Sequence, residues 1–337
     1  MIYKNLEIFN VAELSEGSMG GMRIHRFPLS VEKAFGAQGI RMNRNATGVE
    51  IRFRMISDTV KLHLSVEGDG GASAYFYRGS VLSKWQDLSR YIRGGEGNVL
   101  TFEKADNPEY FNEITRSGNF PFSPEVIRLI VNGGPLQIVD VEGEIEPPRK
   151  EDLPTRTYLA YGSSITHGSN ALCTPYMFTN LVGDRFRADV RNLGMAGSAL
   201  LEHEVADYIA EEGANGKWDF ATLCMGINCL SRAEEDIYES VGYMIDKVAG
   251  ANPRKHIFCI SPIFSDADIR GSESPKRWRR IIGELVDKYN SPYVHYINGL
   301  ALMNGAWGLA GDFVHPSPVG VREIAKNLIA EIEKYIF

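Results

Sequence analysis

Four short segments of the chain carry groups that together could perform acyl transfer. They are Gly162–Gly168, Asn192–Gly197, Gly226–Asn228 and Asp312–Pro316. Between them they contain a hydroxyl nucleophile, an imidazole base, a carboxylate that can orient the imidazole, and donors for an oxyanion. Because a serine hydroxyl is a weak nucleophile until a base takes its proton, these groups have to meet in the fold.

Each segment has an ordinary structural explanation when it is taken alone. Gly162, Ser163 and Ser164 could form a turn and a helix cap. Asp312–His315 could be a capping loop before a helix. The order of the four segments, within a stretch of alternating strands and helices, favours a shared chemical role over four independent turns.

The second half of the chain, residues 151–337, has the pattern of an α/β domain. Short apolar runs alternate with helical periodicity. We expect strands at 157–161, 190–193, 220–225, 256–260 and 294–297, and helices at 175–186, 201–212, 233–249, 275–289 and 318–335. This alternation predicts a doubly wound, flavodoxin-like five-stranded parallel sheet. Reacting groups gather at the carboxyl ends of strands in such sheets, so the four segments should converge on one edge.

In the first half of the chain the hydrophobic period is two from about residue 40 to 146, which predicts that residues 1–150 form an antiparallel, jelly-roll-like β-sandwich. Strand candidates, separated by glycine-rich turns, are 49–55, 60–66, 72–77, 99–102, 126–131 and 136–145. Residues 146–154 are rich in proline and charge and lack periodicity. We expect them to form the linker between the two domains.

Given these residues, the chain from about 155 to 337 resembles the SGNH hydrolase superfamily, also called GDSL esterases and lipases. The family's first block, Gly-Asp-Ser followed four positions later by Gly, corresponds to Gly162, Ser163, Ser164 and Gly168. The resemblance implies that Ser164 is the nucleophile. Without this register, the sequence would not show which of the two adjacent serines is the nucleophile.

The other three blocks of the family imply the remaining roles. Gly197 and Asn228 correspond to oxyanion-hole donors, which would act together with the amide of Ser164. Asp312 and His315 correspond to the orienting acid and the base. One oxyanion donor is typically worth about 3 to 4 kcal/mol of transition-state stabilisation.

The chain departs from the family pattern at two positions. Ser163 and Cys229 stand where the family has aspartate. Neither aspartate is directly required for acyl transfer, so we expect altered substrate contacts, Cys229 included, and not a loss of activity.

Other residues are secondary candidates. His167 is a rival base that could instead line the pocket or be exposed, and Trp307 could form the wall of an acyl or sugar pocket or be an ordinary packed aromatic. Trp278 lies in a basic helical stretch and is expected to lie along the surface. The histidines at 203 and 256 are interpreted as structural, and those at 25 and 63 fall outside the second domain.

Composition limits the classes of partner. The chain has 337 residues, 44% hydrophobic and 23% charged, and a formal net charge of -7. Without a dense basic cluster, nucleic acid and membrane surfaces are poor candidates. The N-terminus does not look like a signal peptide, so a cytoplasmic location is the default and a trimmed secreted form stays open. The four cysteines lack disulfide or zinc spacing.

These observations lead to one expected function and two alternatives. We expect a serine esterase that needs no cofactor or metal and cleaves short-chain acyl esters, chiefly acetyl. A β-sandwich before such a domain is similar to the arrangement in several carbohydrate esterases of the superfamily, which implies a small-molecule or oligosaccharide ester as substrate. An acyltransferase with the same triad and a non-catalytic carbohydrate-binding protein are the alternatives. The sequence leaves the acyl length, the alcohol portion and a homo-oligomer open.

Overall fold

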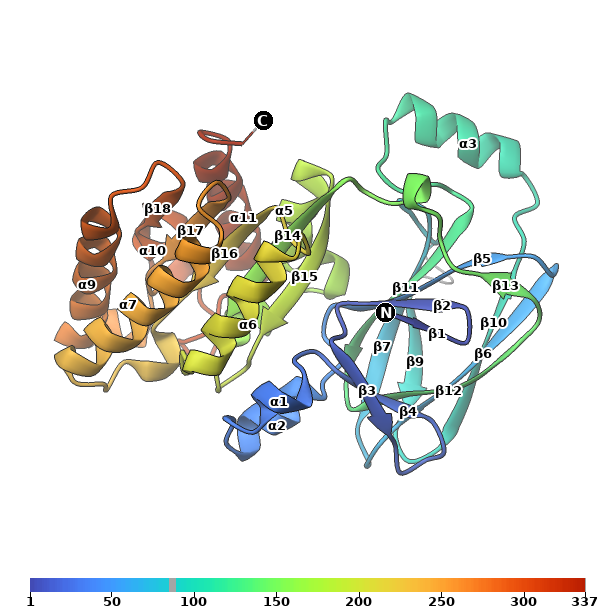
Figure 1. Cartoon of the computed structure of the whole chain (residues 1–337), viewed down its shortest axis with the longest axis horizontal. Coiled ribbons are helices and arrows are strands. Elements are labelled where there is room, and N and C mark those ends of the chain that lie inside the picture. Colours follow the sequence, from blue (N-terminus) through green and yellow to red (C-terminus); the bar gives the residue numbers. More distant parts are fainter. Residues whose placement is uncertain (85–88, 337) are drawn as a thin grey trace. The chain divides into compact units, whose positions relative to one another are not determined.

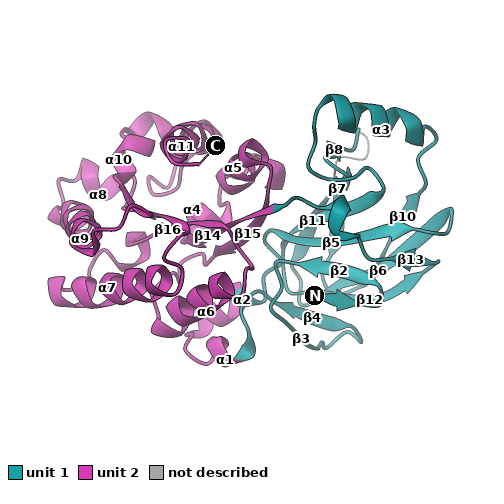
Figure 2. Ribbon diagram, turned by 45° about the horizontal axis from the view of Figure 1, so that its top comes forward, with its two compact units in different colours: residues 1–29, 43–155 teal, residues 30–42, 156–337 magenta. Residues whose placement is uncertain are grey.

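The computed structural model describes residues 1–84 and 89–336 (Figure 1). Its contacts divide the chain into two compact units (Figure 2). The first contains Met1–Leu29 and Asn43–Thr155, and the second contains Ser30–Met42 and Arg156–Phe337. The sequence led us to expect one boundary near residue 150. Ser30–Met42 departs from that expectation because its contacts are with residues far along the chain, which local periodicity does not report.

The first unit consists of two antiparallel sheets, as the alternating pattern predicted. One has the order β1-β2-β5-β11-β7-β8, with β13 beside β5 and β9 beside β7, and the other has the order β10-β6-β12-β4-β3. The strand bounds are β1 Ile2–Tyr3, β2 Leu6–Phe9, β3 Glu13–Glu16, β4 Met22–His25, β5 Val49–Met55, β6 Thr59–Val66, β7 Gly71–Arg78, β8 Val81–Leu82, β9 Ser89–Arg93, β10 Gly97–Glu103, β11 Val126–Gly133, β12 Leu136–Glu142 and β13 Ile145–Glu146. Inward side chains of both sheets, such as Phe53 and Leu64, form one core. The helix α3 (Pro108–Ser117) joins β10 to β11.

The stretch expected to be a linker is partly packed on the first unit. Ile145 and Glu146 pair with β5, and Lys150–Asp152 form a short 3-10 helix, η2. The carboxylate of Asp152 is buried and accepts a hydrogen bond from Arg54 Nη1 at 2.8 Å. These contacts are polar and long-range, so they leave no periodic signal in the sequence.

The second unit contains the expected parallel sheet, with the order β15-β14-β16-β17-β18. The strands are β14 Arg156–Gly162, β15 Ala188–Gly194, β16 Phe220–Cys224, β17 His256–Ile260 and β18 Val294–Ile297. All neighbouring pairs are parallel. The predicted flavodoxin-like fold is therefore confirmed, and the segments that follow the strands share one sheet edge.

Helices cover both faces of this sheet, with α5 and α11 on one side and α6 and α7 on the other (Figure 2). The helix bounds are α1 Leu29–Glu32, α2 Ala37–Asn43, α4 Ser164–His167, α5 Phe178–Phe186, α6 His203–Ala214, α7 Glu234–Ala251, α8 Asp266–Ile269, α9 Glu273–Tyr289, α10 Gly299–Leu302 and α11 Pro318–Ile332. Further 3-10 turns are η3 Thr174–Tyr176, η4 Ile227–Cys229 and η5 Ala306–Gly308. The last helix begins as the sequence indicated, because the Ser317 hydroxyl accepts the amide of Gly320 at 3.3 Å and Pro318 starts the first turn.

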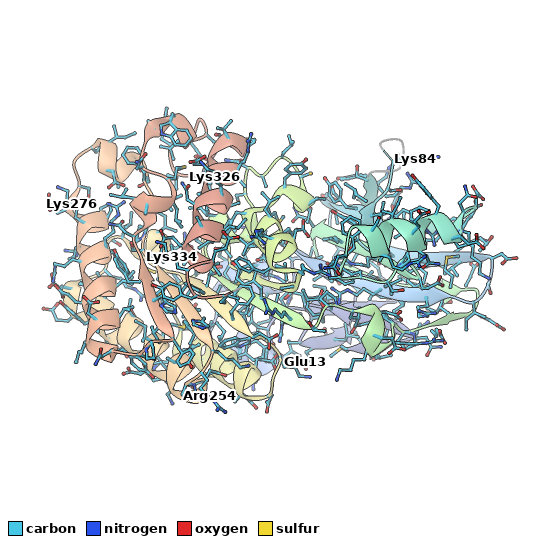
Figure 3. All side chains as sticks on the ribbon, turned by 90° about the horizontal axis from the view of Figure 1, so that it is seen from above. Glu13, Lys84, Arg254, Lys276, Lys326 and Lys334 are labelled. Atoms are coloured by element: carbon cyan, nitrogen blue, oxygen red, sulfur yellow. The ribbon has the colours of Figure 1, made fainter. Side chains whose placement is uncertain are left out.

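Charged side chains project from the outside of the helices. Lys276 of α9, Lys326 of α11 and Lys334, which follows α11, are labelled in Figure 3, and all three residues are exposed. Within the described part of the chain, no helix is long and apolar enough to cross a membrane.

Candidate active site

Ser164 is the first residue of α4, directly after the tight turn that follows β14. Ser163 precedes it and caps α4, because its hydroxyl accepts the amide of the residue two positions on at 3.3 Å. Gly162 has no room for a side chain, since a Cβ there would lie 2.3 Å from Thr166 Oγ1. The short helix ends at Gly168, whose φ of 100° is in the left-handed region. The glycines of the first block thus define the turn that presents Ser164.

A chain of hydrogen bonds joins Ser164 to His315 and Asp312. Ser164 Oγ lies 2.7 Å from His315 Nε2, and His315 Nδ1 lies 2.8 Å from Asp312 Oδ2. Because a carboxylate only accepts, Nδ1 carries the proton and Nε2 is left to accept from the serine hydroxyl. Residues about 150 positions apart in sequence are thereby placed for proton transfer.

Asp312 is held in its charged form by the backbone of its own loop. The amide of His315 donates to Asp312 Oδ1 at 2.9 Å and lowers the pKa of Asp312. Slight burial opposes this effect, while the amide of Val314 and the ring of His315 add to it, and the pKa falls to about 2. Asp312 therefore stays ionised and can orient His315 across the whole neutral range.

The loop that carries Asp312 and His315 is closed on itself. Leu309 and Pro316 form a bridge, and the amide of Ala310 donates to the carbonyl of His315 at 2.8 Å. Inside this loop Phe313 adopts a φ of 58°, a left-handed conformation that costs a bulky residue roughly 1 to 3 kcal/mol. The closed loop maintains this strained conformation and leaves the Phe313 side chain 56% exposed beside the catalytic candidates.

Three potential oxyanion donors follow β14, β15 and β16. They are the amides of Ser164 and Gly197 and Nδ2 of Asn228. The amide of Ala199 donates to Asn228 Oδ1 at 3.2 Å, which anchors that side chain by its oxygen and leaves its nitrogen as a donor. Gly197 has a φ of 67°, which only glycine adopts without strain. Within the described residues, none of these three donors has a hydrogen-bond acceptor, so all three can bind an oxyanion.

Asn192 and Gly194 lock the second segment against α4, a role that sequence reasoning did not assign. Asn192 Nδ2 donates to the carbonyl of Thr166 at 2.8 Å, and Asn192 Oδ1 accepts the amide of Gly194 at 2.8 Å. A Cβ on Gly194 would lie 2.3 Å from the amide nitrogen of His167. The Asn-x-Gly part of the motif therefore holds the turn of Ser164 in place, and Gly197 remains the candidate for an oxyanion donor.

This geometry agrees with a family comparison. The model of the GDSL-like lipase/acylhydrolase family matches residues 155–333. The chain belongs to the GDSL-like lipase/acylhydrolase family. The resemblance read from the four sequence blocks is thus confirmed. A search of curated protein sequences finds no significant match.

Solved structures share the GDSL fold and the preceding unit over nearly the whole chain. The salicylyl-acyltransferase SsfX3 from a tetracycline biosynthetic pathway has a TM-score of 0.79 at 15% identity, covering 98% of this chain and 94% of that chain. A family two carbohydrate esterase from Cellvibrio japonicus has a TM-score of 0.63 at 11% identity, and the match covers 98% of this chain and 95% of that chain. An acetyl xylan esterase, Est2A, from Butyrivibrio proteoclasticus has a TM-score of 0.58 at 11% identity, covering 99% and 96%. At these identities the likeness shows the fold.

Two GDSL-family aspartates are replaced in this chain, and both replacements are buried. Ser163 still caps α4 through its side-chain oxygen, as an aspartate would. The Cys229 thiol lies 3.6 Å from the carbonyl of Ala199, and burial raises its pKa to about 11, so it is neutral at pH 7. Cys229 is only 4% exposed. Contact of Cys229 with a substrate stays a prediction.

His167 and Trp307, the other secondary candidates, lie near the catalytic candidates in sequence, His167 three positions after Ser164 and Trp307 five positions before Asp312. His167 is half-buried at the last position of α4, and the hydroxyl of Ser164 is bonded to His315 instead. Trp307 lies in η5, before Asp312, and is 56% exposed. Contact of either side chain with a substrate stays a prediction.

Trp278 is fully buried, so the prediction that it lies along the surface is wrong. Its Nε1 donates to the carbonyl of Cys229 at 3.2 Å, and a Cβ on Gly226 would lie 2.6 Å from its ring. The reason is that α9 is amphipathic: its basic side chains at 276 and 280 face outward, while Trp278 and Ile282 share the buried face. Trp278 thus packs against the turn that carries Asn228.

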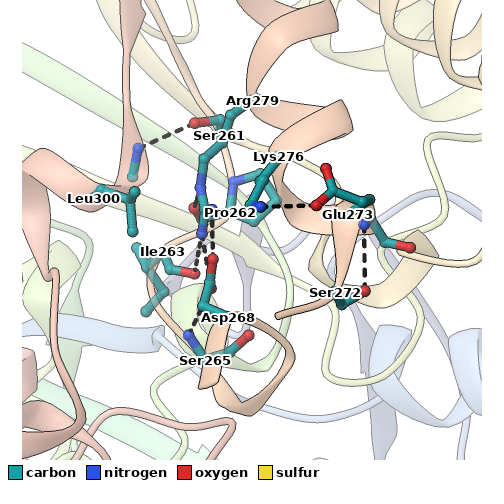
Figure 4. A network of polar contacts seen from close by, with 12 residues as sticks. Ser261, Pro262, Ile263, Ser265, Asp268, Ser272, Glu273, Lys276, Arg279 and Leu300 are labelled. Carbon is teal, nitrogen blue, oxygen red and sulfur yellow. Dashed lines mark hydrogen bonds and ion pairs between the residues drawn. The ribbon is translucent and has the colours of Figure 1, made fainter. Parts of the chain in front are cut away.

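Arg279, the next residue of α9, braces the loop after β17 (Figure 4). Its Nε donates to the carbonyl of Pro262 at 2.9 Å, and its terminal nitrogens bind both oxygens of Asp268 at 2.6 and 2.9 Å. The braced loop reaches the GDSL site, because the amide of Asp266 donates to the carbonyl of Phe313 at 2.8 Å. Sequence reasoning missed this brace, since a buried arginine looks like its exposed neighbours in a single sequence.

Proposed function

We propose that this GDSL-family chain is a serine esterase that hydrolyses short-chain acyl esters, chiefly acetyl esters of carbohydrates, through an acyl-enzyme on Ser164. The observation that carries the proposal is the continuous hydrogen-bond chain from Ser164 through His315 to Asp312, at 2.7 and 2.8 Å. A nucleophile, a base and an orienting acid in this relation are the minimum for acyl transfer.

The proposed reaction uses these groups in turn. Ser164 Oγ attacks the ester carbonyl while its proton moves to His315 Nε2. The negative charge that develops on the carbonyl oxygen is stabilised by the amides of Ser164 and Gly197 and by Asn228 Nδ2. His315 then gives its proton to the departing alcohol oxygen, which leaves the acyl group on Ser164. A water molecule, deprotonated by His315, attacks this acyl-enzyme; the bond between the acyl carbon and Ser164 Oγ then breaks, His315 returns the proton to Ser164 Oγ, and the acid is released.

Two observations support a short acyl group on a sugar. A cavity of about 30 Å³ adjoins the nucleophile turn and is lined by both neighbours of Ser164 together with apolar side chains such as Met225 and Ile227. A cavity of this size holds about two water-sized groups, which favours an acetyl group over a long alkyl chain. The sugar part is supported by the shared fold with carbohydrate esterases.

A chain-length series tests the proposal. Initial rates are measured on p-nitrophenyl acetate, butyrate and octanoate, and acetate release is measured on acetylated xylooligosaccharides. We expect acetate to be the best acyl group and acetylated sugars to be substrates. A preference for octanoate, or no acetate release from any acetylated saccharide, would contradict the carbohydrate part. Complete inactivity on every ester would contradict the esterase itself.

An acyltransferase is the second candidate. It is favoured by the TM-score of 0.79 to the salicylyl-acyltransferase, over 98% of this chain. The same acyl-enzyme would then pass its acyl group to an alcohol other than water. The series is therefore repeated with an alcohol acceptor, and a new ester formed in preference to free acid would favour the transferase. A purely carbohydrate-binding protein would need none of the four groups that meet at Ser164.

A further inference from the structure

We propose that Gln38 is a positioning residue that holds and polarises the Gly197 peptide, the oxyanion donor contributed by the loop after β15. The proposal rests on the esterase function proposed above. Gln38 belongs to Ser30–Met42, the segment that leaves the first unit between β4 and β5 and is part of the second unit.

The segment is an excursion from the first unit with a closed base. The amide of Arg26 donates to the carbonyl of Asn43 at 3.0 Å, and the side chain of Asn43 binds the amide and the carbonyl of Phe27 at 2.6 and 3.1 Å. The chain therefore departs and returns at one point. Most of α1 and α2 belongs to this excursion.

Gln38 contacts the backbone next to Gly197. Its Nε2 donates to the carbonyl of Ala196 at 2.8 Å. A Cβ built on Gly197 would lie 3.7 Å from the same nitrogen, so the side chain lies against this glycine. The hydroxyl of Ser198 is 3.5 Å from the Ala196 oxygen, at the limit of a hydrogen bond. Gln38 thus makes the shorter side-chain contact to this carbonyl.

The carbonyl that Gln38 holds belongs to the same peptide group as the donor. The C=O of Ala196 and the N–H of Gly197 lie in one plane and point in opposite directions across a trans peptide. A hydrogen bond on the oxygen therefore fixes the direction of the N–H. Gly197 needs this help, because glycine has the freest backbone of all residues.

The contact also polarises the donor. The guanidinium of Arg41 donates to Gln38 Oε1, so a positive charge begins a chain of hydrogen bonds that runs through the Gln38 amide to the peptide. Hydrogen bonds in such chains strengthen one another. The N–H of Gly197 should therefore be a stronger donor to a developing oxyanion than an isolated amide.

The test compares Gln38→Ala, Gln38→Glu and Gln38→Lys. Loss of an oxyanion donor costs about 100-fold to 1,000-fold in kcat, and loss of its support should cost less. We expect Gln38→Ala and Gln38→Glu to lower kcat on p-nitrophenyl acetate about 10-fold with KM nearly unchanged. Gln38→Lys keeps a donor for the carbonyl and should recover part of the loss. Affinity for a boronic acid that forms a tetrahedral adduct with serine should fall in parallel with kcat.

Lys33→Ala is the matched control, because Lys33 is an exposed cation on the same segment. It should leave kcat, KM and the melting temperature as in the wild type. The proposal is overturned if Gln38→Ala and Gln38→Glu retain full kcat, if their loss falls on KM alone, or if Lys33→Ala is equally damaged.

A second readout separates this proposal from the esterase assignment. In protein labelled with 15N-glycine, the amide resonance of Gly197 should shift in Gln38→Ala and stay in place in Lys33→Ala. A wild type inactive on all esters would defeat the esterase function, and the Gly197 shift would still report the contact. An unmoved Gly197 resonance would defeat the positioning role even in an active enzyme.

Discussion

The two serines of the nucleophile turn have different surroundings at the scale of single residues. Ser164 Oγ contacts His315 Nε2, whereas Ser163 Oγ accepts a backbone amide. We expect Ser164→Ala to abolish ester hydrolysis and labelling by a fluorophosphonate. Ser163→Ala should stay active and lose about 1 kcal/mol of stability, the usual cost of a missing helix cap. Label on Ser163, or full turnover by Ser164→Ala, would reassign the nucleophile.

Replacing each of the two histidines near Ser164 should have a different effect on the kinetic constants. His315→Ala should lower kcat about a thousand-fold or more, because no other ring contacts Ser164 Oγ in the described structure. His167→Ala should mainly change KM. Asp312→Asn should cost less than loss of the histidine, since the backbone amides that bind Asp312 Oδ1 can still hold its side chain. Equal damage from His167→Ala and His315→Ala would require a new choice of base.

At the scale of elements, α9 supports the site through two adjacent residues with different partners. Trp278 lies under the turn of Asn228, and Arg279 braces the loop that is bonded to Phe313. Arg279→Ala would leave the Asp268 carboxylate, which is only 12% exposed, without its arginine partner. Breaking a buried pair in this way costs about 3 to 5 kcal/mol. We expect a lower unfolding midpoint in urea together with a lower kcat.

Arg280→Ala provides the control for this brace on the same helix. Arg280 pairs with Glu234 and Glu284 on the surface, where both carboxylates and the guanidinium are more than 40% exposed. An exposed pair contributes about 1 kcal/mol or less. Equal losses of stability from Arg279→Ala and Arg280→Ala would show that the buried brace has no special role.

At the scale of the whole molecule, the pair formed by the half-buried His256 and the buried His295 should make stability depend on pH. His256 Nδ1 lies 2.9 Å from His295 Nε2, between β17 and β18, with the rings of Tyr293, Tyr335 and Phe258 around them. Burial, and then the charge of His256, lower the pKa of His295 from 6.5 to about 4. Burial also lowers the pKa of His256. The folded state therefore favours the neutral rings.

The direction of the effect follows from proton uptake. Below the unfolded pKa of 6.5 the unfolded chain binds more protons than the folded chain. The stabilisation is complete above that pH and is lost as the pH falls from about 6.5 towards 4. We expect the melting temperature to drop over this range, and His295→Phe, which keeps the ring packing, to reduce the drop. His63→Gln, in the first unit, should leave it as in the wild type. A wild-type melting temperature that is constant over this range would exclude the mechanism.

The sequence alone determined the features that depend on local patterns. Alternation with period two in residues such as Val60, Leu62 and Leu64 defined strands, and helical periodicity with a Ser-Pro start defined α11. These patterns work because burial of one face is decided within a few neighbouring residues. The motif blocks then indicated which loop residues could do chemistry, because turns that require glycine and helix caps are determined by neighbouring residues.

Only the tertiary structure decided which distant groups touch. Whether Trp278 is buried depends on the turn of Gly226, and the role of Asp152 depends on Arg54 in a strand of the first unit. Gln38 lies 158 positions from Ala196, and no pattern around it signals that contact. Single polar contacts of this kind have no period and no fixed spacing. They arise when packing of the apolar faces has already set the distance between two segments, and that distance is a property of the whole fold.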